Sequence, residues 1–553
     1  METVSHTEIF DYPLGEYYSV PEFGGGIAGT AKEAIAMWRR GRKWVSDRGH
    51  SSVGSSGSPS YLQVVNGIIA GVTSLGNVSS FYSTLWAAGS GNIVESGSVT
   101  GAVSGSLVLK VSGSYVTAGL TTPSAPTFAA TATASTKFNG TYSVGVVAVR
   151  VTSGAISNIS LRSAVIAVNN KKGLITFPSA PTGATHWLVY GTIRGQGSNG
   201  VLRKVTTIAP VTVGTATLLV DWVDGELGDL APITNDPPPA CTHCFPIGAL
   251  MCVASSGGMI YPSKPGQPEA YDVSLAVRLA SGEAPVGVTA RGSDGGVFIG
   301  TRNSISLIVA TGSESAPILP RGVFENVGIA NGNAMCWIYD TLYVFSSTGS
   351  LCRTHGGSEP DTSFAAPVEQ YFIDRGFTGS NTYLIHDELN GCLLVCSGTK
   401  AKPYMLKTGE WSGEITLPGT VRGGIALSGS GLVDVGGTTY TLNTAGGSPN
   451  GGASIRSPYL PCAPSGLEFY TKKFMNYRGA GTGSWTHDFF KNQVASTIGG
   501  PFPKSFTGPH DANWTQTLIN GIYSLAFKAS CTGGGQEYQP STAELEIDPA
   551  HIG

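Results

Sequence analysis

Apolar and polar residues alternate along most of the chain in short runs that end at Gly, Ser, Asn or Asp. Alternation with a period of two residues is typical of β-strands that bury one face. A helical period occurs from Thr30 to about Trp44, where Thr30 and Glu33 match a capping box and apolar residues follow at helical spacing. We therefore expect an all-β protein with a short N-terminal helix.

A hairpin pattern recurs after the break at Asp236-Pro237-Pro238-Pro239. The turns of five such hairpins centre near Gly257, Gly295, Asp340, Gly391 and Ser430, at intervals of 38, 45, 51 and 39 residues. A hairpin about every 40 to 50 residues is typical of β-propeller blades, each a small sheet that needs neighbours on both faces. We predict that residues 229–456 hold the main β-propeller blades.

Longer alternating strands occupy residues 136–228, with Trp187 and Tyr190 on one of them. The expected strands are Tyr142–Val151, Ala155–Val168, Gly173–Phe177, His186–Thr192, Val201–Ile208 and Ala216–Trp222. Such a series of short strands is typical of a small antiparallel sandwich, and its spacing resembles a fibronectin type III module. We expect this β-sandwich to be inserted into the propeller or between its blades.

The remaining residues complete the predicted division. Residues 1–50 are expected to form an N-terminal arm and helix for docking, and 51–135 the first propeller blade or blades. Strand patterns such as Tyr61–Val65 favour packed sheet over a flexible linker in this Gly- and Ser-rich part. Residues 457–553 are expected to form a closing blade or a C-terminal β layer.

The charge content is low, because only 12% of the 553 residues are charged and the formal net charge is −3. This balance excludes a strongly basic nucleic-acid clamp, although a neutral or acidic tube through which DNA slides is compatible with it. Sparse charges favour a surface that partner subunits partly cover. The N-terminus lacks an apolar signal stretch and no apolar run has membrane length, which predicts a soluble protein made in the cytoplasm.

The one dense basic cluster alternates with tryptophans near the N-terminus. It comprises Trp38, Arg39, Arg40, Arg42, Lys43 and Trp44. Such a cluster could anchor an acidic partner surface or grip phosphates, with the indoles packing beside it. It could equally be the solvated end of a helix, where cations complement the dipole. Between the two binding roles, we favour protein docking.

Two further motifs match patterns of known binding sites, but each lacks a feature that such a site requires. Gly24, Gly26 and Gly29 match a dinucleotide-binding pattern before the expected helix, but no buried strand precedes them, so a loop is favoured. The Cys241-Thr242-His243-Cys244 sequence lacks the second ligand pair that structural zinc needs. Cys392 and Cys396 are expected on one face of a strand as core residues.

Catalytic patterns are absent from the sequence. We find no G-x-S-x-G elbow, no H-E-x-x-H helix and no motif with paired carboxylates. His355, His386 and His487 each lie near an acid in sequence, but isolated pairs of this kind are usually surface or turn residues. The sequence therefore predicts no enzyme, no cofactor and no metal.

Three passages carry a resemblance to a known family. They are DWVDGELGDLAPITNDPPPACTHCFPIGALMCVASSGGMIYPSKPGQPEAY from Asp221, GGVFIGTRNSISLIVATGS from Gly295, and IRSPYLPCAPSGLEFYTKKFMNYRGAGTGSW from Ile455. In their residue pattern and module order they resemble the β-propeller tail proteins of short-tailed bacteriophages. These are the tail nozzle, or tail tubular protein B-like, proteins and the related packaged-DNA stabilisation hub proteins.

The resemblance implies a structural virion protein. Such proteins assemble as a six-fold ring below the head-to-tail adaptor and portal proteins, enclose the double-stranded DNA channel, and carry tail fibre or spike proteins. It implies a place in the virion tail after synthesis in the host cytoplasm. The alternative from another class is a carbohydrate-binding β-propeller, either a receptor-binding adhesin or a glycan hydrolase, whose aromatic residues would stack on sugars.

Overall fold

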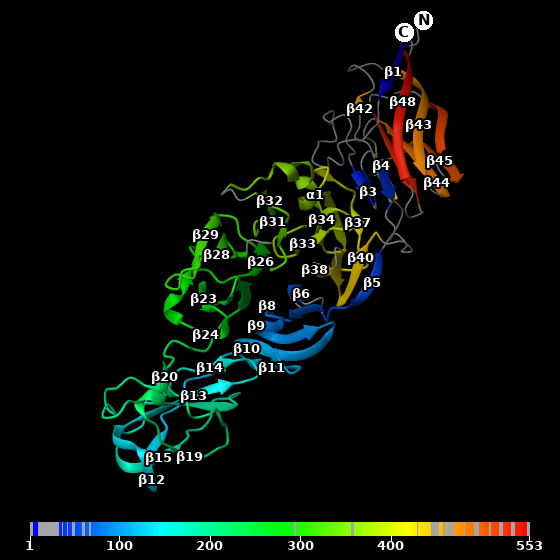
Figure 1. Cartoon of the computed structure of the whole chain (residues 1–553). Coiled ribbons are helices and arrows are strands. Elements are labelled where there is room, and N and C mark those ends of the chain that lie inside the picture. Colours follow the sequence, from blue (N-terminus) through cyan, green and yellow to red (C-terminus); the bar gives the residue numbers. More distant parts are fainter. Residues whose placement is uncertain are drawn as a thin grey trace.

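The computed structural model describes residues 4–8, 33–35, 37–40, 43–46, 50–57, 61–65, 68–291, 295–355, 359–427, 430–443, 453–456, 460–461, 469–480, 482–491, 497–507, 510–518, 524–531 and 537–549. As expected, this part of the chain is nearly all β. Its helices are α1 (Glu369–Asp374) and the 3-10 helices η1 (Asp224–Glu226), η2 (Val273–Leu275) and η4 (Ser363–Val368). The molecule is elongated, with a group of sheets in the middle and a β module at each end (Figure 1).

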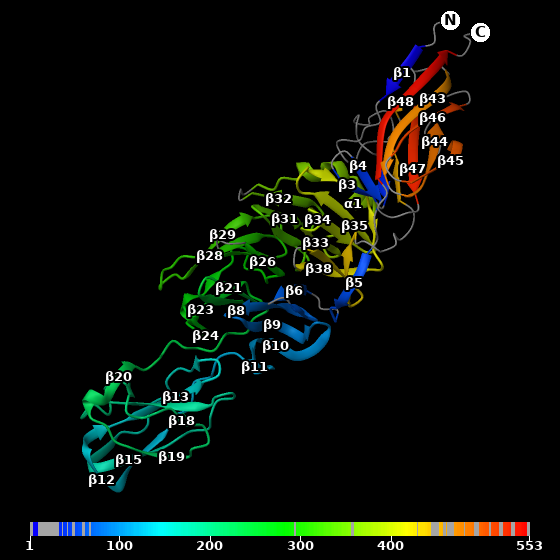
Figure 2. The same cartoon turned by 45° about the vertical axis from the view of Figure 1, so that its right-hand side comes forward.

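Six antiparallel sheets, which we call the sheet ring, make up the middle (Figure 2). Sheet 1 contains β6 (Tyr61–Val65), β7 (Ile68–Val72), β8 (Leu75–Phe81), β9 (Thr84–Glu95), β10 (Ser98–Val111) and β11 (Ser114–Thr117). Sheet 2 contains β21 (His243–Ile247), β22 (Leu250–Ala254), β23 (Met259–Lys264), β24 (Gln267–Tyr271) and β25 (Val277–Arg278). Sheet 3 contains β26 (Gly287–Arg291), β27 (Gly296–Gly300), β28 (Ile305–Ala310) and β29 (Ile318–Phe324).

The other three sheets follow along the chain. Sheet 4 contains β30 (Met335–Ile338), β31 (Thr341–Phe345) and β32 (Leu351–Thr354). Sheet 5 contains β33 (Thr382–Asp387), β34 (Cys392–Ser397), β35 (Lys400–Met405), β36 (Glu410–Trp411) and β37 (Ile415–Thr416). Sheet 6 contains β38 (Val421–Leu427), β39 (Ser430–Val435), β40 (Thr438–Leu442) and β5 (His50–Ser55). The five hairpins predicted from their turns are confirmed as β22–β23, β26–β27, β30–β31, β33–β34 and β38–β39.

The six sheets contact one another in a closed cyclic order. β8 of sheet 1 contacts β21, and the first strands of sheets 2 to 6 contact each other in sequence. β38 of sheet 6 then contacts β6, which returns the order to sheet 1. In addition, β5 precedes sheet 1 in the chain but pairs with β40 as a strand of sheet 6. The ring is therefore closed by an N-terminal strand.

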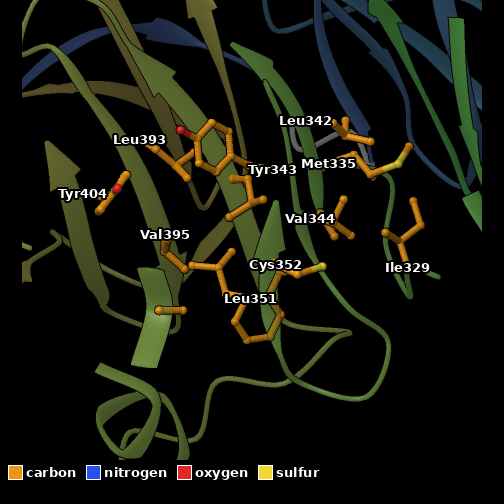
Figure 3. Close-up of a cluster of buried hydrophobic side chains, with 14 of the residues drawn as sticks. Ile329, Met335, Leu342, Tyr343, Val344, Leu351, Cys352, Leu393, Val395 and Tyr404 are labelled. Carbon is orange, nitrogen blue, oxygen red and sulfur yellow. The ribbon is translucent and has the colours of Figure 1, made fainter. Parts of the chain in front are cut away.

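The hydrophobic core of the ring lies between neighbouring sheets. Figure 3 shows Leu342 and Val344 of sheet 4 in one cluster with Leu393 and Val395 of sheet 5. Every residue of β34 is buried, including Cys392 and Cys396, which confirms their expected place in the core. The second strands of sheets 2, 3 and 4 are buried along their whole length in the same way. The sequences of these strands are nearly continuous runs of apolar residues, because other sheets cover both of their faces.

Two sheets between β11 and β21 form a β-sandwich module. One contains β12 (Thr127–Tyr142), β15 (Ile166–Thr176) and β19 (Thr217–Val220). The other contains β13 (Val144–Arg150), β14 (Ala155–Ile156), β16 (His186–Gly191), β17 (Arg203–Val205), β18 (Val211–Thr212) and β20 (Leu227–Leu230). Trp222 packs edge-on against Phe138 in the core between them, with ring centroids 4.5 Å apart. The predicted boundary between residues 135 and 136 is wrong, because it falls inside the continuous strand β12.

Strands from both ends of the chain form the last module. Its first sheet contains β1 (Val4–Glu8), β3 (Met37–Arg40), β4 (Lys43–Ser46), β43 (Phe469–Ala480), β46 (His510–Leu518) and β48 (Glu537–Pro549). Its second contains β2 (Glu33–Ile35), β41 (Ala453–Arg456), β42 (Leu460–Pro461), β44 (Thr482–Lys491), β45 (Thr497–Thr507) and β47 (Ser524–Cys531). The C-terminal residues therefore form a separate β layer and do not close the ring. β41 belongs to this layer, so the predicted boundary after residue 456 is also misplaced.

The expected N-terminal helix is wrong. Three strands, β2, β3 and β4, occupy most of the residues assigned to it. β2 pairs with β41, and β4 pairs with β48 about 490 residues further along the chain. An isolated helix of this length is marginal in water, and Gly41 lies inside it, so pairing with distant strands outweighs the local helical pattern.

Candidate docking surfaces

A buried ion pair joins the sandwich module to the sheet ring. Arg150 lies at the end of β13, and its Nη1 is 3.1 Å from Oε2 of Glu269 on β24. Both residues are almost fully buried. Arg150 Nη2 also donates to the carbonyl of Thr117, and the Gly119 N–H donates to the same Glu269 oxygen at 2.7 Å. Loss of either charged partner would leave a buried charge uncompensated, so this pair fixes where the sandwich meets the ring.

A second set of hydrogen bonds fixes the exit from the sandwich. Lys264 Nζ, at the end of β23, donates to Thr234 Oγ1 and to Asn235 Oδ1, both at 2.7 Å. Burial lowers the pKa of Lys264, while the nearby carboxylates of Asp272 and Asp236 act in the opposite direction. The β23–β24 hairpin therefore holds both the entry and the exit of the sandwich module.

A groove lies beside this hairpin, between sheets 2 and 3. Its volume is about 670 Å³, and the loop between β28 and β29 forms part of its wall. Apolar lining residues include Ile247, Leu250, Pro262, Leu275 and Pro317, and polar ones include Lys264, Gln267, Asp272 and Glu314. A groove of this size can take several side chains of a partner, so it is the first candidate docking surface.

The second candidate is a group of exposed apolar side chains on the segments around β17 and β20. Its exposed apolar side chains are Leu161, Val201, Leu230 and Ile233, with exposed fractions of 78%, 56%, 58% and 74%. Their segments lie side by side, because the Ile159 N–H donates to the Pro232 carbonyl and the Ala231 N–H to the Leu202 carbonyl. Arg162 adjoins Leu161 in the chain, and Arg203 lies opposite Leu230 in the register, whereas Lys204 lies opposite Tyr190 and points to the other side of β17.

The predicted basic cluster lies on the β3–β4 hairpin. Arg39 pairs with Trp44 and Arg40 with Lys43 in the backbone register, and Trp38 pairs with Val45. Arg42 lies outside the described residues. The structure thus brings Trp38, Arg39, Arg40, Lys43 and Trp44 together on a hairpin, where a helix end was expected. Its role in docking stays a prediction.

The two cysteines of the Cys241–Cys244 motif lie in the core between sheets 1 and 2. Both thiols and His243 are buried, and burial raises the pKa of Cys241 to about 12. The backbone of Cys244 exchanges two hydrogen bonds with the side-chain amide of Asn77, at 2.7 and 2.8 Å. The part of the chain that the structure describes contains no group of three His, Cys, Asp or Glu residues suited to a metal ion. The motif therefore serves sheet packing.

Gly24, Gly26 and Gly29, which match a dinucleotide-binding pattern in the sequence, lie outside the described residues. The Asp387 carboxylate is buried and accepts hydrogen bonds from Asn390 and from the Gly431 N–H, which ties sheet 5 to sheet 6. Among the described helices, none is long and apolar enough to cross a membrane.

Sequence reasoning missed the Arg150–Glu269 pair. The available signal was a single charge in each of two otherwise apolar or neutral strands, VGVVAVR and QPEAY. A lone charge at a strand end is usually exposed. The sequence pattern therefore could not predict that Arg150 pairs with a residue 119 positions further along the chain.

Comparisons with known proteins identify no family. No protein-family model matches the chain, and no curated protein matches it. The chain is similar to the crystal structure of the computationally designed Ika8 protein, with 8% identity, a TM-score of 0.29, and coverage of 71% of this chain and 97% of that one. It is also similar to BamB from Moraxella catarrhalis, with 12% identity, a TM-score of 0.24, and coverage of 52% and 86%. The AfRom2 CNH domain matches with 10% identity, a TM-score of 0.26, and coverage of 58% and 90%. TM-scores of this size do not establish a shared fold.

Proposed function

We propose that this chain is a structural subunit of a bacteriophage tail, the nozzle or hub of a short-tailed phage. In this proposal the sheet ring is a six-bladed β-propeller, and the sandwich module is a fibronectin type III-like insertion between its first two blades. The observation that carries the proposal is the closed cyclic order of the six sheets, interrupted once by the sandwich. The same module order underlies the resemblance of residues 138–485 to the nozzle family.

The charge distribution supports a role in assembly. A subunit of a closed ring needs two different complementary faces, and covered faces carry few charges. With 12% charged residues, the chain has about half the usual share. A net charge of −3 also suits a channel that does not hold phosphates, since a basic wall would bind DNA.

We further propose that the basic β3–β4 hairpin docks to the adaptor or to a neighbouring tail protein. It lies in the terminal β module, at the opposite end of the molecule from the sandwich (Figure 1). Within this module the hairpin lies on the side nearest to the sheet ring, so the proposed partner would bind where the terminal module meets the ring (Figure 1).

Cryo-electron microscopy of the full chain mixed with the head-to-tail adaptor of the same phage tests the proposal. We expect a six-fold ring around an open channel. The variant Arg39→Glu/Arg40→Glu/Lys43→Glu should lose adaptor binding and keep the circular dichroism spectrum of the parent, whereas the matched control Lys171→Glu should bind normally. A chain that stays monomeric with the adaptor and binds a glycan would favour the carbohydrate-binding alternative.

A further inference from the structure

A small pocket, which we call the junction pocket, lies where sheets 1 and 2 of the ring meet the sandwich module. Its volume is about 430 Å³, which is within the range of sites for small ligands. The turn between β8 and β9 and the turn between β10 and β11 supply the wall from sheet 1. The turn after β13 and the β23–β24 turn supply the opposite walls, through Thr152, Ser153, Gly266 and Pro268.

The buried ion pair holds these opposite walls in place. The carbonyl of Arg150 accepts hydrogen bonds from the N–H groups of Ser153 and Gly154, at 3.3 and 2.9 Å, and so forms the turn after β13. The guanidinium of Arg150 binds Glu269, on the strand that begins directly after Gly266. Since one pair sets both walls, the pocket is formed before any ligand arrives.

Hydroxyl groups that lack a partner gather around the junction pocket. They belong to the lining residues Tyr82, Thr84, Ser112, Thr152 and Ser153, and none of them has a hydrogen-bond partner among the residues that the structure describes. The Oγ of Ser153 is buried as well. Buried polar atoms in proteins are nearly always hydrogen-bonded, so this oxygen indicates a polar molecule in the pocket.

One exposed aromatic ring borders the pocket in an unusual backbone conformation. Tyr82 and Ser83 form the two-residue turn between β8 and β9, with φ angles of 47° and 61°. Such turns favour Asn-Gly, because a side chain at positive φ is strained. The Tyr82 ring contacts that of Phe81, yet the residue is 63% exposed, so burial does not require a tyrosine here. Strain that packing does not explain is typical of functional sites.

The lining of the pocket carries no uncompensated charge. Lys110 is the one charged residue among the described residues that line it, and its Nζ lies 2.6 Å from Oε2 of Glu95. An ionic ligand needs an oppositely charged partner once it leaves water, and the lining offers none that is unpaired. The pocket therefore favours a neutral ligand that forms many hydrogen bonds.

We propose that the junction pocket binds a neutral saccharide. Sugar hydroxyls both donate and accept hydrogen bonds, as the hydroxyls of the lining do. The apolar C–H face of a sugar ring packs on the exposed ring of Tyr82, which combines a large apolar surface with a polar tip. This inference goes beyond the proposed function and does not depend on it, because every wall of the pocket comes from a single chain.

Saturation-transfer difference NMR of the full chain tests the proposal. The probes are the neutral trisaccharides maltotriose, cellotriose and mannotriose, and trigalacturonic acid is the anionic comparison. We expect transfer to at least one neutral probe, whose affinity is then measured by isothermal titration calorimetry. Trigalacturonic acid should show no transfer, and binding as tight as that of the neutral probe would contradict the ligand class.

Variants of Tyr82 locate the binding. Tyr82→Ala should weaken it by about tenfold, since the stacking ring is lost. Tyr82→Phe keeps the ring and should bind within about fivefold of the parent. The matched control Tyr339→Ala removes another exposed tyrosine at positive φ, in the β30–β31 turn, and should bind like the parent. Circular dichroism checks that each variant keeps the parent fold.

The outcomes separate this pocket from the proposed function. Binding of none of the neutral trisaccharides, or equal binding by the parent and Tyr82→Ala, would overturn the inference. A six-fold ring that binds no saccharide would still leave the nozzle proposal standing. A persistent monomer that binds a trisaccharide through Tyr82 would support the pocket and overturn the nozzle proposal.

Discussion

At the scale of single residues, burial decides what the polar side chains do. His243 was a candidate ligand in a Cys-x-His-Cys sequence, but it is almost fully buried, and burial lowers its pKa from 6.5 to about 4. The imidazole is therefore held neutral on the side of β21 that faces sheet 3, where the backbone of Val286 is its hydrogen-bond partner. A neutral buried histidine that must accept a proton on unfolding makes stability depend on pH.

We predict that the free energy of unfolding falls by about 3 kcal/mol as the pH drops from 6.5 to 4, through His243 alone. The sign follows because the unfolded chain binds a proton in this window and the folded chain does not. Above pH 7 the contribution is constant. Urea unfolding of the parent and of His243→Gln measures it: the difference between the two proteins should change across the window.

The matched control for this prediction is Ser198→Gln, because Ser198 is exposed and has no titratable side chain. Its difference from the parent should stay nearly constant between pH 7.5 and 4.5, a range in which urea unfolding resolves about 1 kcal/mol. If His243→Gln also tracks the parent at every pH, the histidine does not titrate as its burial requires.

At the scale of elements, one segment shows why a strand prediction failed. Ala155–Val168 was expected to be a single strand, but β14 ends at Ile156 and β15 begins at Ile166. Between them, Ser157, Ser160 and Ser163 each exchange hydrogen bonds with the edge of β13. Their hydroxyls accept from the N–H groups of Ala148, Val146 and Val144, and their own N–H groups donate to the carbonyls of the same residues.

The serines of this segment recur every three residues, whereas the β13 residues to which they bond recur every two. The serine hydroxyls supply acceptors that a partner strand would supply through its backbone, so the edge of β13 is closed without a further strand. The sequence pattern SNISLRS contains the three-residue spacing, but alternation of apolar residues around it suggested a strand.

We predict that Ser160→Ala destabilises the protein by about 1 to 3 kcal/mol, because the buried N–H of Val146 loses its acceptor. Thermal unfolding of the full chain measures the change. Ser198→Ala is the matched control, since this side chain is exposed, and its unfolding temperature should equal that of the parent. Equal temperatures for all three proteins would mean that water replaces the hydroxyl.

At the scale of the whole molecule, ring closure depends on a strand from the N-terminal side. Among the residues whose side chains the structure describes, Ile69 and Leu432 are buried at the junction of sheets 6 and 1, with Ile425 beside them. β5 reinforces this junction by pairing with β40. The Ser56 hydroxyl, directly after β5, also donates to the buried carboxylate of Asp434.

We predict that Ser51→Pro/Ser52→Pro opens this closure. Alternate residues of an antiparallel strand donate to the partner, so one of two adjacent prolines must remove a ladder hydrogen bond. Hydrogen exchange should accelerate in β40 and β39 and stay slow in β34. The control Ser51→Ala/Ser52→Ala should exchange like the parent, and equal protection of β40 in both variants would show that closure does not need β5.

Much of the ring could be predicted from the sequence by itself. The five hairpins follow from turns of Gly, Asp and Asn between apolar runs, because turn chemistry and strand alternation act over a few residues. The boundaries predicted for Tyr61–Val65 agree with β6 for the same reason. Cys392 and Cys396 could be placed on one buried face because side chains four apart on a strand point the same way.

Tertiary structure alone decided which distant segments pair. The segment from Thr30 to about Trp44 has a helical pattern, yet its described residues lie in β2, β3 and β4, because β41 and β48 supply partners more than 400 residues away. The candidate docking surfaces depend on the same long-range contacts, since Arg150 and Glu269 set the sandwich beside the groove. Local patterns report local preferences, whereas pairing over hundreds of residues depends on the balance of burial and hydrogen bonding in the complete fold.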